Sequence, residues 1–177
     1  MKLQAPRTIV MTSIAAFLLV TGYLLRTAPA RSAQAAPSKP ASTDDHEPPW
    51  TTGQTIDAPT LAKALSGSKA ANANPPLIVC VGFHTLYEGA HIPGASLHGP
   101  GSTPQGLDAL KQWAKPLPRN ANIIIYCGCC PLAHCPNVRP AFTALRDMGF
   151  THLRVLILLH DFATDWVGPG YPIEKGK

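Results

Sequence analysis

Four of the chain's five cysteines and one histidine lie within a single short segment, YCGCCPLAHCPN, residues 126–137. Thiols gathered in this way can act as nucleophiles, bind a soft metal ion, or form disulfides. Which chemistry applies depends on the fold, because the surroundings decide which thiol is ionised and which one is accessible. The elements that position this segment therefore have to be predicted first.

Apolar runs of strand length alternate with amphipathic stretches along the second half of the chain. The apolar runs are residues 75–81, 122–126 and 153–159. The stretches with helical spacing are residues 104–115, 137–150 and 161–166. Continuous apolar strands are typical of sheets that are buried on both faces. The alternation predicts an α/β fold with a parallel sheet flanked by helices on both faces.

The cysteine segment begins at the carboxyl end of one predicted strand, residues 122–126, and ends where a helix begins. Sites of parallel α/β sheets lie at this end of the strands. Cys127 is the first residue after the strand, where loop N–H groups and the partial positive charge of the following helix stabilise a thiolate. We predict that Cys127 is the catalytic nucleophile and that its pKa is lowered.

Further motifs accompany Cys127 in a fixed order. They are LYEGAHIPGA (86–95), IIIYCG (123–128), MGF (148–150) and DFATDWVGPGYPIE (161–174). Together they resemble the rhodanese (sulfurtransferase) family over about residues 53–174. The resemblance implies a five-stranded parallel sheet and sulfane-sulfur transfer through a persulfide on Cys127. It also implies a small sulfur donor and a thiol acceptor, including a protein thiol.

Two departures distinguish the chain from that family. The family usually has an Asp and an Arg at the end of one strand, where this sequence has Cys80 and Gly82. The active loop is also longer than the family's, and its first arginine is Arg139, at the start of the next helix. Since thiosulfate is an anion, the sequence predicts weak thiosulfate binding, with Arg139 as a partial substitute for the missing cation.

The extra loop residues Cys129, Cys130, His134 and Cys135 leave three interpretations open. One of these cysteines could resolve a persulfide or sulfenate on Cys127. Zinc or copper could bind to the four loop cysteines and His134, which would make the domain a non-catalytic metal-binding or protein-interaction module. A disulfide, for example between Cys130 and Cys135, could pin the loop. His134 could also hold a thiolate or donate a proton.

The first 36 residues have the pattern of a targeting segment. A short basic stretch precedes the uncharged apolar run 8–25, and Ala-x-Ala sites follow it. This pattern is typical of a signal peptide or an N-terminal membrane anchor. We expect residues 1–36 to have this role, residues 37–52 to be a Pro/Ser-rich linker, and residues 53–177 to form an exported, periplasmic or otherwise extracytoplasmic domain.

The net charge of +5 comes mainly from four basic residues in this leader: Lys2, Arg7, Arg26 and Arg31. Because no basic stripe interleaved with aromatic residues remains, nucleic-acid binding is not expected. Membrane contact is expected only through the N-terminal segment. No glycine-rich nucleotide loop is present, so we expect no organic cofactor.

Overall fold

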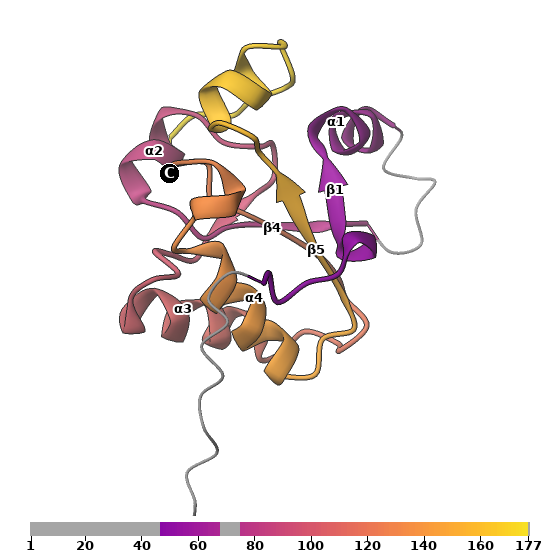
Figure 1. Ribbon diagram of the computed structural model, residues 1–177, viewed down its shortest axis with the longest axis vertical. Helices are drawn as coiled ribbons and strands as arrows, with labels where there is room; N and C mark the ends of the chain where they lie inside the picture. Colours follow the sequence, from indigo (N-terminus) through magenta and orange to yellow (C-terminus); the bar gives the residue numbers. More distant parts are fainter. Residues whose placement is uncertain (1–46, 68–74, 177) are drawn as a thin grey trace, which may run out of the picture. The chain divides into compact units, whose positions relative to one another are not determined.

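Five parallel strands form one sheet in the computed structural model, which describes residues 47–67 and 75–176 (Figure 1). The strands are β1 (Thr55–Asp57), β2 (Leu77–Cys80), β3 (Ser96–Leu97), β4 (Asn122–Tyr126) and β5 (His152–Ile157). Their order is β1-β5-β4-β2-β3, and every neighbouring pair is parallel. The predicted five-stranded parallel sheet is confirmed, with β4 as its central strand.

Helices cover both faces of this sheet (Figure 1). The α-helices are α1 (Ala58–Ser66), α2 (His84–Gly89), α3 (Pro104–Ala114) and α4 (Val138–Asp147). Short helical turns occur at η1 (Thr52–Gln54), η3 (Leu132–His134) and η4 (Ala163–Val167). The connection between successive parallel strands thus carries a helix back across the sheet, as such folds require.

The residues of β4 explain why both faces are covered. Ile123 and Ile125 pack with α3 and α4 in one core, whereas Ile124 and Tyr126 pack with α1, α2 and η4 in the other. Alternate residues of a strand point to opposite faces, so a strand that is apolar at every position has to be buried on both sides. This burial fixes β4, and with it the point where the cysteine loop starts.

The predicted leader, residues 1–36, lies outside the described residues. In the part of the chain that is described, no helix is long and apolar enough to cross a membrane. The last residues of the predicted linker lie against the domain. The Trp50 ring packs edge-on against Phe142 of α4, at 5.5 Å between ring centroids. Packing against the domain therefore begins before residue 53.

Candidate active site

A tight turn after β4 places the first cysteine of the loop. Cys127 directly follows the strand, and Gly128 has a φ of +87°, a conformation that favours glycine. A Cβ at Gly128 would lie 2.9 Å from the Cβ of Phe162, so no larger residue fits without a shift. The Phe162 N–H donates to the Gly128 carbonyl at 3.1 Å. The turn is thus held in place by the segment that follows β5.

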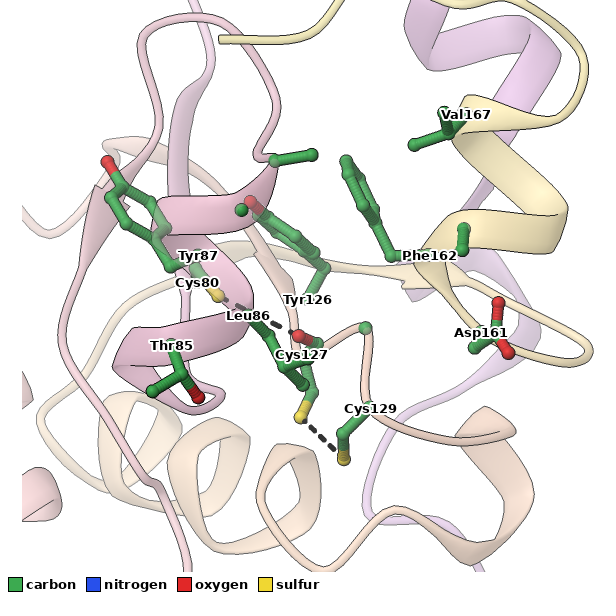
Figure 2. A pocket seen from close by; sticks show the side chains of 14 residues that line it. Cys80, Thr85, Leu86, Tyr87, Tyr126, Cys127, Cys129, Asp161, Phe162 and Val167 are labelled. Atoms are coloured by element: carbon green, nitrogen blue, oxygen red, sulfur yellow. Dashed lines mark hydrogen bonds between the residues drawn. The ribbon is translucent and has the colours of Figure 1, made fainter. Parts of the chain in front are cut away.

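The loop brings three sulfur atoms together. The Sγ atoms of Cys127, Cys129 and Cys135 all lie within 4.8 Å of one another, and we name these residues the three-sulfur group. The Cys127 and Cys129 sulfurs are 3.2 Å apart (Figure 2). Cys130 lies outside this group, although its Sγ is 3.1 Å from that of Cys129. All five cysteines, including Cys80, are free thiols.

A fully buried asparagine at the start of α4 contacts two of these sulfurs. The Asn137 Nδ2 donates to Cys127 Sγ at 3.3 Å and approaches Cys129 Sγ at 3.9 Å. Its Oδ1 accepts the backbone N–H of Ser102 at 3.0 Å. Because a backbone N–H can only donate, this contact fixes the amide orientation and directs the NH₂ group toward sulfur. Asn137 therefore positions the Cys127 thiol.

Cys135 has the electrostatic environment of a thiolate. Hydrogen bonding with the Cys127 thiol and with the backbone N–H groups of Asn137 and Val138 lowers its pKa. These two N–H groups belong to the start of α4, where unpaired donors and the helix dipole favour a negative charge. The hydrogen bonds outweigh burial and lower the pKa of Cys135 to about 6.

The lowered pKa that we predicted for Cys127 is wrong. The hydrogen bond with Cys135 raises the pKa of Cys127, and burial raises it further. The only backbone N–H that acts on its sulfur is that of Cys129. The enlarged loop is the physical reason, because it places Cys135 rather than Cys127 against the first N–H groups of α4. Burial also raises the pKa of Cys130 to about 12.

A pocket of about 330 Å³ opens beside the loop (Figure 2). Cys127 and Cys129 line it, whereas Cys135 does not. Most other lining residues are apolar or aromatic: Leu86, Tyr87, Ala90, Tyr126, Phe162, Ala163 and Val167. No lysine, arginine or histidine is among the described residues that line it, and its one charged residue is Asp161. The pocket therefore offers no cation to an anionic substrate.

Two positions beside Cys127 differ from the family pattern and have clear structural roles. A Cβ at Gly82 would lie 2.6 Å from the Cys127 carbonyl oxygen and 3.2 Å from its Sγ. Position 82 therefore has no space for the family's arginine. Cys80 is buried, as an apolar strand predicts, and its thiol donates to the Cys127 carbonyl at 3.7 Å. Burial raises the pKa of Cys80 to about 11, so this thiol stays protonated.

Two residues that the sequence placed near the nucleophile lie elsewhere. His134 is exposed in η3 and is not part of the three-sulfur group. The Arg139 guanidinium donates to the Glu47 carbonyl at 2.8 Å and lies over the Trp50 ring. Asn137 was not among the predicted site residues, although it is the first residue of the predicted helix 137–150. That position indicates a helix cap, yet its side chain makes no capping bond and contacts sulfur instead.

Comparisons with known proteins bear on the fold. No protein-family model matches the sequence, and no curated protein matches it. The BH2092 protein from Bacillus halodurans has a similar structure, with a TM-score of 0.51 and 21% identity over 68% of this chain and 76% of that chain.

Two further solved structures carry functional names. The rhodanese-like domain of the Alr3790 protein from Anabaena sp. gives a TM-score of 0.49 and 25% identity over 69% of this chain and 79% of that chain. Thiosulfate sulfurtransferase from Pseudomonas aeruginosa gives 0.47 and 23% over 70% of this chain and 19% of that one. The described domain shares the fold of the BH2092 protein and has the five-stranded parallel sheet that the sequence motifs predicted. A cluster of cysteines lies at the end of its central strand.

Proposed function

We propose that the domain transfers sulfane sulfur through a persulfide on Cys127. The observation that carries this proposal is the three-sulfur group at the end of β4, of which Cys127 and Cys129 reach the pocket. A nucleophile has to meet its substrate, and Cys127 does so at the strand end where such folds build their sites. The rhodanese-like fold supports cysteine-based sulfur chemistry at this position.

Cys135 supplies the base that Cys127 needs. The Cys127 and Cys135 sulfurs lie within 4.8 Å of one another. The Cys127 proton can therefore pass to the Cys135 thiolate as Cys127 Sγ attacks the outer sulfur of a donor persulfide, R–S–SH. The donor S–S bond breaks, the leaving thiolate R–S⁻ takes a proton from water in the pocket, and Cys135 returns its proton to water. The products are the Cys127 persulfide and R–SH, and Cys135 is again a thiolate.

The pocket favours an organic persulfide, whose carbon chain can lie against its apolar side chains, over thiosulfate. Asp161 is its one charged residue, and this carboxylate accepts the Thr164 N–H at 2.7 Å. Leu86 and Val167 are 50% and 37% exposed at the pocket, so its rim is apolar. A dianion without a cationic partner loses its hydration and gains little in return. A small organic persulfide therefore fits the pocket better.

The leader bears on where this reaction takes place. Residues 1–36 have the pattern of a signal peptide or anchor, which supports export to the periplasm or another extracytoplasmic space. Other thiols there are the acceptors that the proposal requires, including those of proteins.

Mass spectrometry of the loop peptide tests the proposal. Purified protein is incubated with glutathione persulfide or thiosulfate, blocked with an alkylating reagent, and digested without reduction. We expect one added sulfur atom on Cys127, formed faster from glutathione persulfide than from thiosulfate. The absence of added sulfur from both donors, or its placement only on Cys129 or Cys130, would overturn the proposal.

Metal binding is the competing function, because sulfurs within 4.8 Å of one another also suit a soft ion. Elemental analysis of protein purified under reducing conditions separates the two functions. One zinc or copper ion per chain, together with a loop that accepts no sulfur, would establish a metal-binding module instead. Metal-free protein that forms the Cys127 persulfide supports sulfur transfer.

A further inference from the structure

We infer that the site also reduces the sulfur it carries: Cys135 attacks the Cys127 persulfide, releases hydrosulfide, and leaves a Cys127–Cys135 disulfide. This inference rests on the proposed function, because its starting point is the persulfide on Cys127. It adds an activity to sulfur transfer, since the sulfane sulfur leaves as sulfide before any acceptor meets it.

The placement of the three sulfurs assigns different tasks to Cys129 and Cys135. Cys129 is half-buried and lines the pocket together with Cys127, so it lies on the side where a donor enters. Cys135 is only 2% exposed and does not line the pocket. The sulfur of Cys135 is nevertheless within 4.8 Å of Cys127 Sγ. Cys135 therefore faces Cys127 from the protein interior.

This placement matters because thiolate attack on a sulfur–sulfur bond is in line with the leaving sulfur. The outer sulfur of a Cys127 persulfide comes from a donor in the pocket, so it extends toward the pocket. Attack on the inner sulfur, Cys127 Sγ, then has to come from the opposite side, where Cys135 lies. Cys129 is better placed to meet the outer sulfur, and attack there transfers the sulfur without reducing it.

The step balances with the groups of the site alone. The Cys135 thiolate forms a bond to Cys127 Sγ, and the bond between that sulfur and the outer sulfur breaks. The electron pair and the persulfide hydrogen leave as HS⁻, so one negative charge is present before and after. The sulfane sulfur gains two electrons, and the two cysteines lose them in forming the disulfide. A second turnover requires an external dithiol, which reduces the disulfide.

The start of α4 supports the assignment of Cys135 as the attacking thiol. Its sulfur lies just before the first turn of α4, where unpaired N–H groups and the helix dipole favour a thiolate. Asn137, at this helix start, donates to Cys127 Sγ at 3.3 Å and so orients the sulfur that is attacked.

A single-turnover experiment without external thiol tests the inference. Reduced, desalted protein is mixed with one equivalent of glutathione persulfide, and samples are quenched over time. Hydrosulfide is trapped with monobromobimane, free thiols are counted, and the loop peptide is fragmented without reduction. We expect the Cys127 persulfide to appear first and then decay as one hydrosulfide per chain is released, two thiols are lost and a Cys127–Cys135 bond forms.

Variants assign the step to one thiol. Cys135→Ser is loaded until Cys127 carries the same amount of persulfide as the wild type, and we expect hydrosulfide release to fall at least about 10-fold while the persulfide persists. Cys130→Ser is the matched control and should stay within about threefold of the wild-type rate, because Cys130 lies outside the three-sulfur group and is a minor cause of the lowered Cys135 pKa.

Three outcomes would overturn the inference. The first is a wild-type persulfide that persists without hydrosulfide release, and the second is Cys135→Ser releasing hydrosulfide as fast as wild type. The third is a disulfide from Cys127 to Cys129 alone, and the wild-type peptide reveals it even if Cys135→Ser fails to fold. Protein that never forms the persulfide would instead contradict the proposed function, so the two failures are distinguishable.

Discussion

One buried thiol lies at the end of β4 and another just before α4, and the two have pKa values shifted in opposite directions. Cys127 at the strand end meets the pocket, but its pKa is raised. Cys135 at the helix start does not line the pocket, yet two backbone N–H groups help to lower its pKa to about 6. The thiol that lines the pocket and the thiol whose pKa is lowered are thus different residues.

This division follows from the length of the loop. A short loop would bring the first residue after the strand directly to the helix N-terminus, where one cysteine could be both nucleophile and thiolate. Here the chain passes through η3 before α4 begins, and Cys135 occupies the place at the helix. The proposed reaction then requires proton transfer between the two cysteines.

Removal of the nucleophile is expected to have the largest effect. Cys127→Ser should lower sulfur transfer from glutathione persulfide at least about 1,000-fold, because Cys127 is the thiol that carries the persulfide in the proposed reaction. Sulfur transfer is measured as thiol released per chain. Turnover within a factor of a few of the wild type would show that Cys129, not Cys127, meets the substrate.

Removal of the base should cost less. Cys135→Ala should lower turnover at pH 7 about 100-fold, the size of a general-base contribution. The loss should shrink as the pH rises, since the Cys127 thiol can then ionise by itself. A pH–rate profile of the variant therefore continues to rise at alkaline pH, where that of the wild type is flat. Identical pH–rate profiles of Cys135→Ala and the wild type would contradict the role of Cys135 as the base.

Loss of the asparagine amide should have an intermediate effect. Asn137→Ala removes a buried amide, leaves the Ser102 N–H without its acceptor and frees the Cys127 side chain. We expect the free energy of unfolding to fall by about 1–3 kcal/mol and turnover to fall about 10-fold. Urea denaturation and steady-state kinetics measure the two effects. The exposed Asn120→Ala is the control and should change both values little.

The absorbance near 240 nm measures the fraction of cysteine thiol that is ionised to thiolate. In the wild type it should increase with pH through a midpoint near 6, because the pKa of Cys135 is lowered to about 6. In Cys127→Ala the midpoint should move upward, since the largest contribution to the lowered pKa is the Cys127 hydrogen bond. An unchanged midpoint in Cys127→Ala would contradict the role of Cys127 in lowering the pKa of Cys135. A midpoint near 6 that remains in Cys135→Ala would show that another group titrates there.

The smallest effect is expected at His134. His134→Ala should change turnover less than about twofold, because the imidazole is exposed and outside the three-sulfur group. Kinetics with glutathione persulfide measure this. A loss as large as that of Cys135→Ala would restore His134 as the proton donor that the sequence allowed.

The sheet could be predicted from sequence because its signal is local. The run Ile123–Ile125 is apolar at each position, and only a strand buried on both faces requires this. The strand β3 consists of two residues, Ser96–Leu97, and so short a segment shows no periodicity. The position of Cys127 at the end of β4 followed directly from the predicted strand.

The distribution of charge in the site could not be predicted in this way. It depends on which sulfur meets the first N–H groups of α4, and therefore on the path of the enlarged loop. Cys135 lies two positions before the predicted helix, a place that favours a thiolate. The resemblance to a family with a shorter loop instead assigned the catalytic role to Cys127. The direction of Arg139 depends on Trp50, which the sequence placed in a linker.

Gly82 limits how this domain can evolve. A Cβ at position 82 would lie 2.6 Å from the Cys127 carbonyl oxygen. The Gly82 backbone is also in close contact with Gly99, where a Cβ would lie 2.5 Å from the Gly82 carbonyl oxygen. A single substitution to arginine would displace the nucleophile instead of restoring an anion-binding cation. An anion-binding arginine at position 82 would therefore require the turn at Cys127 to move at the same time.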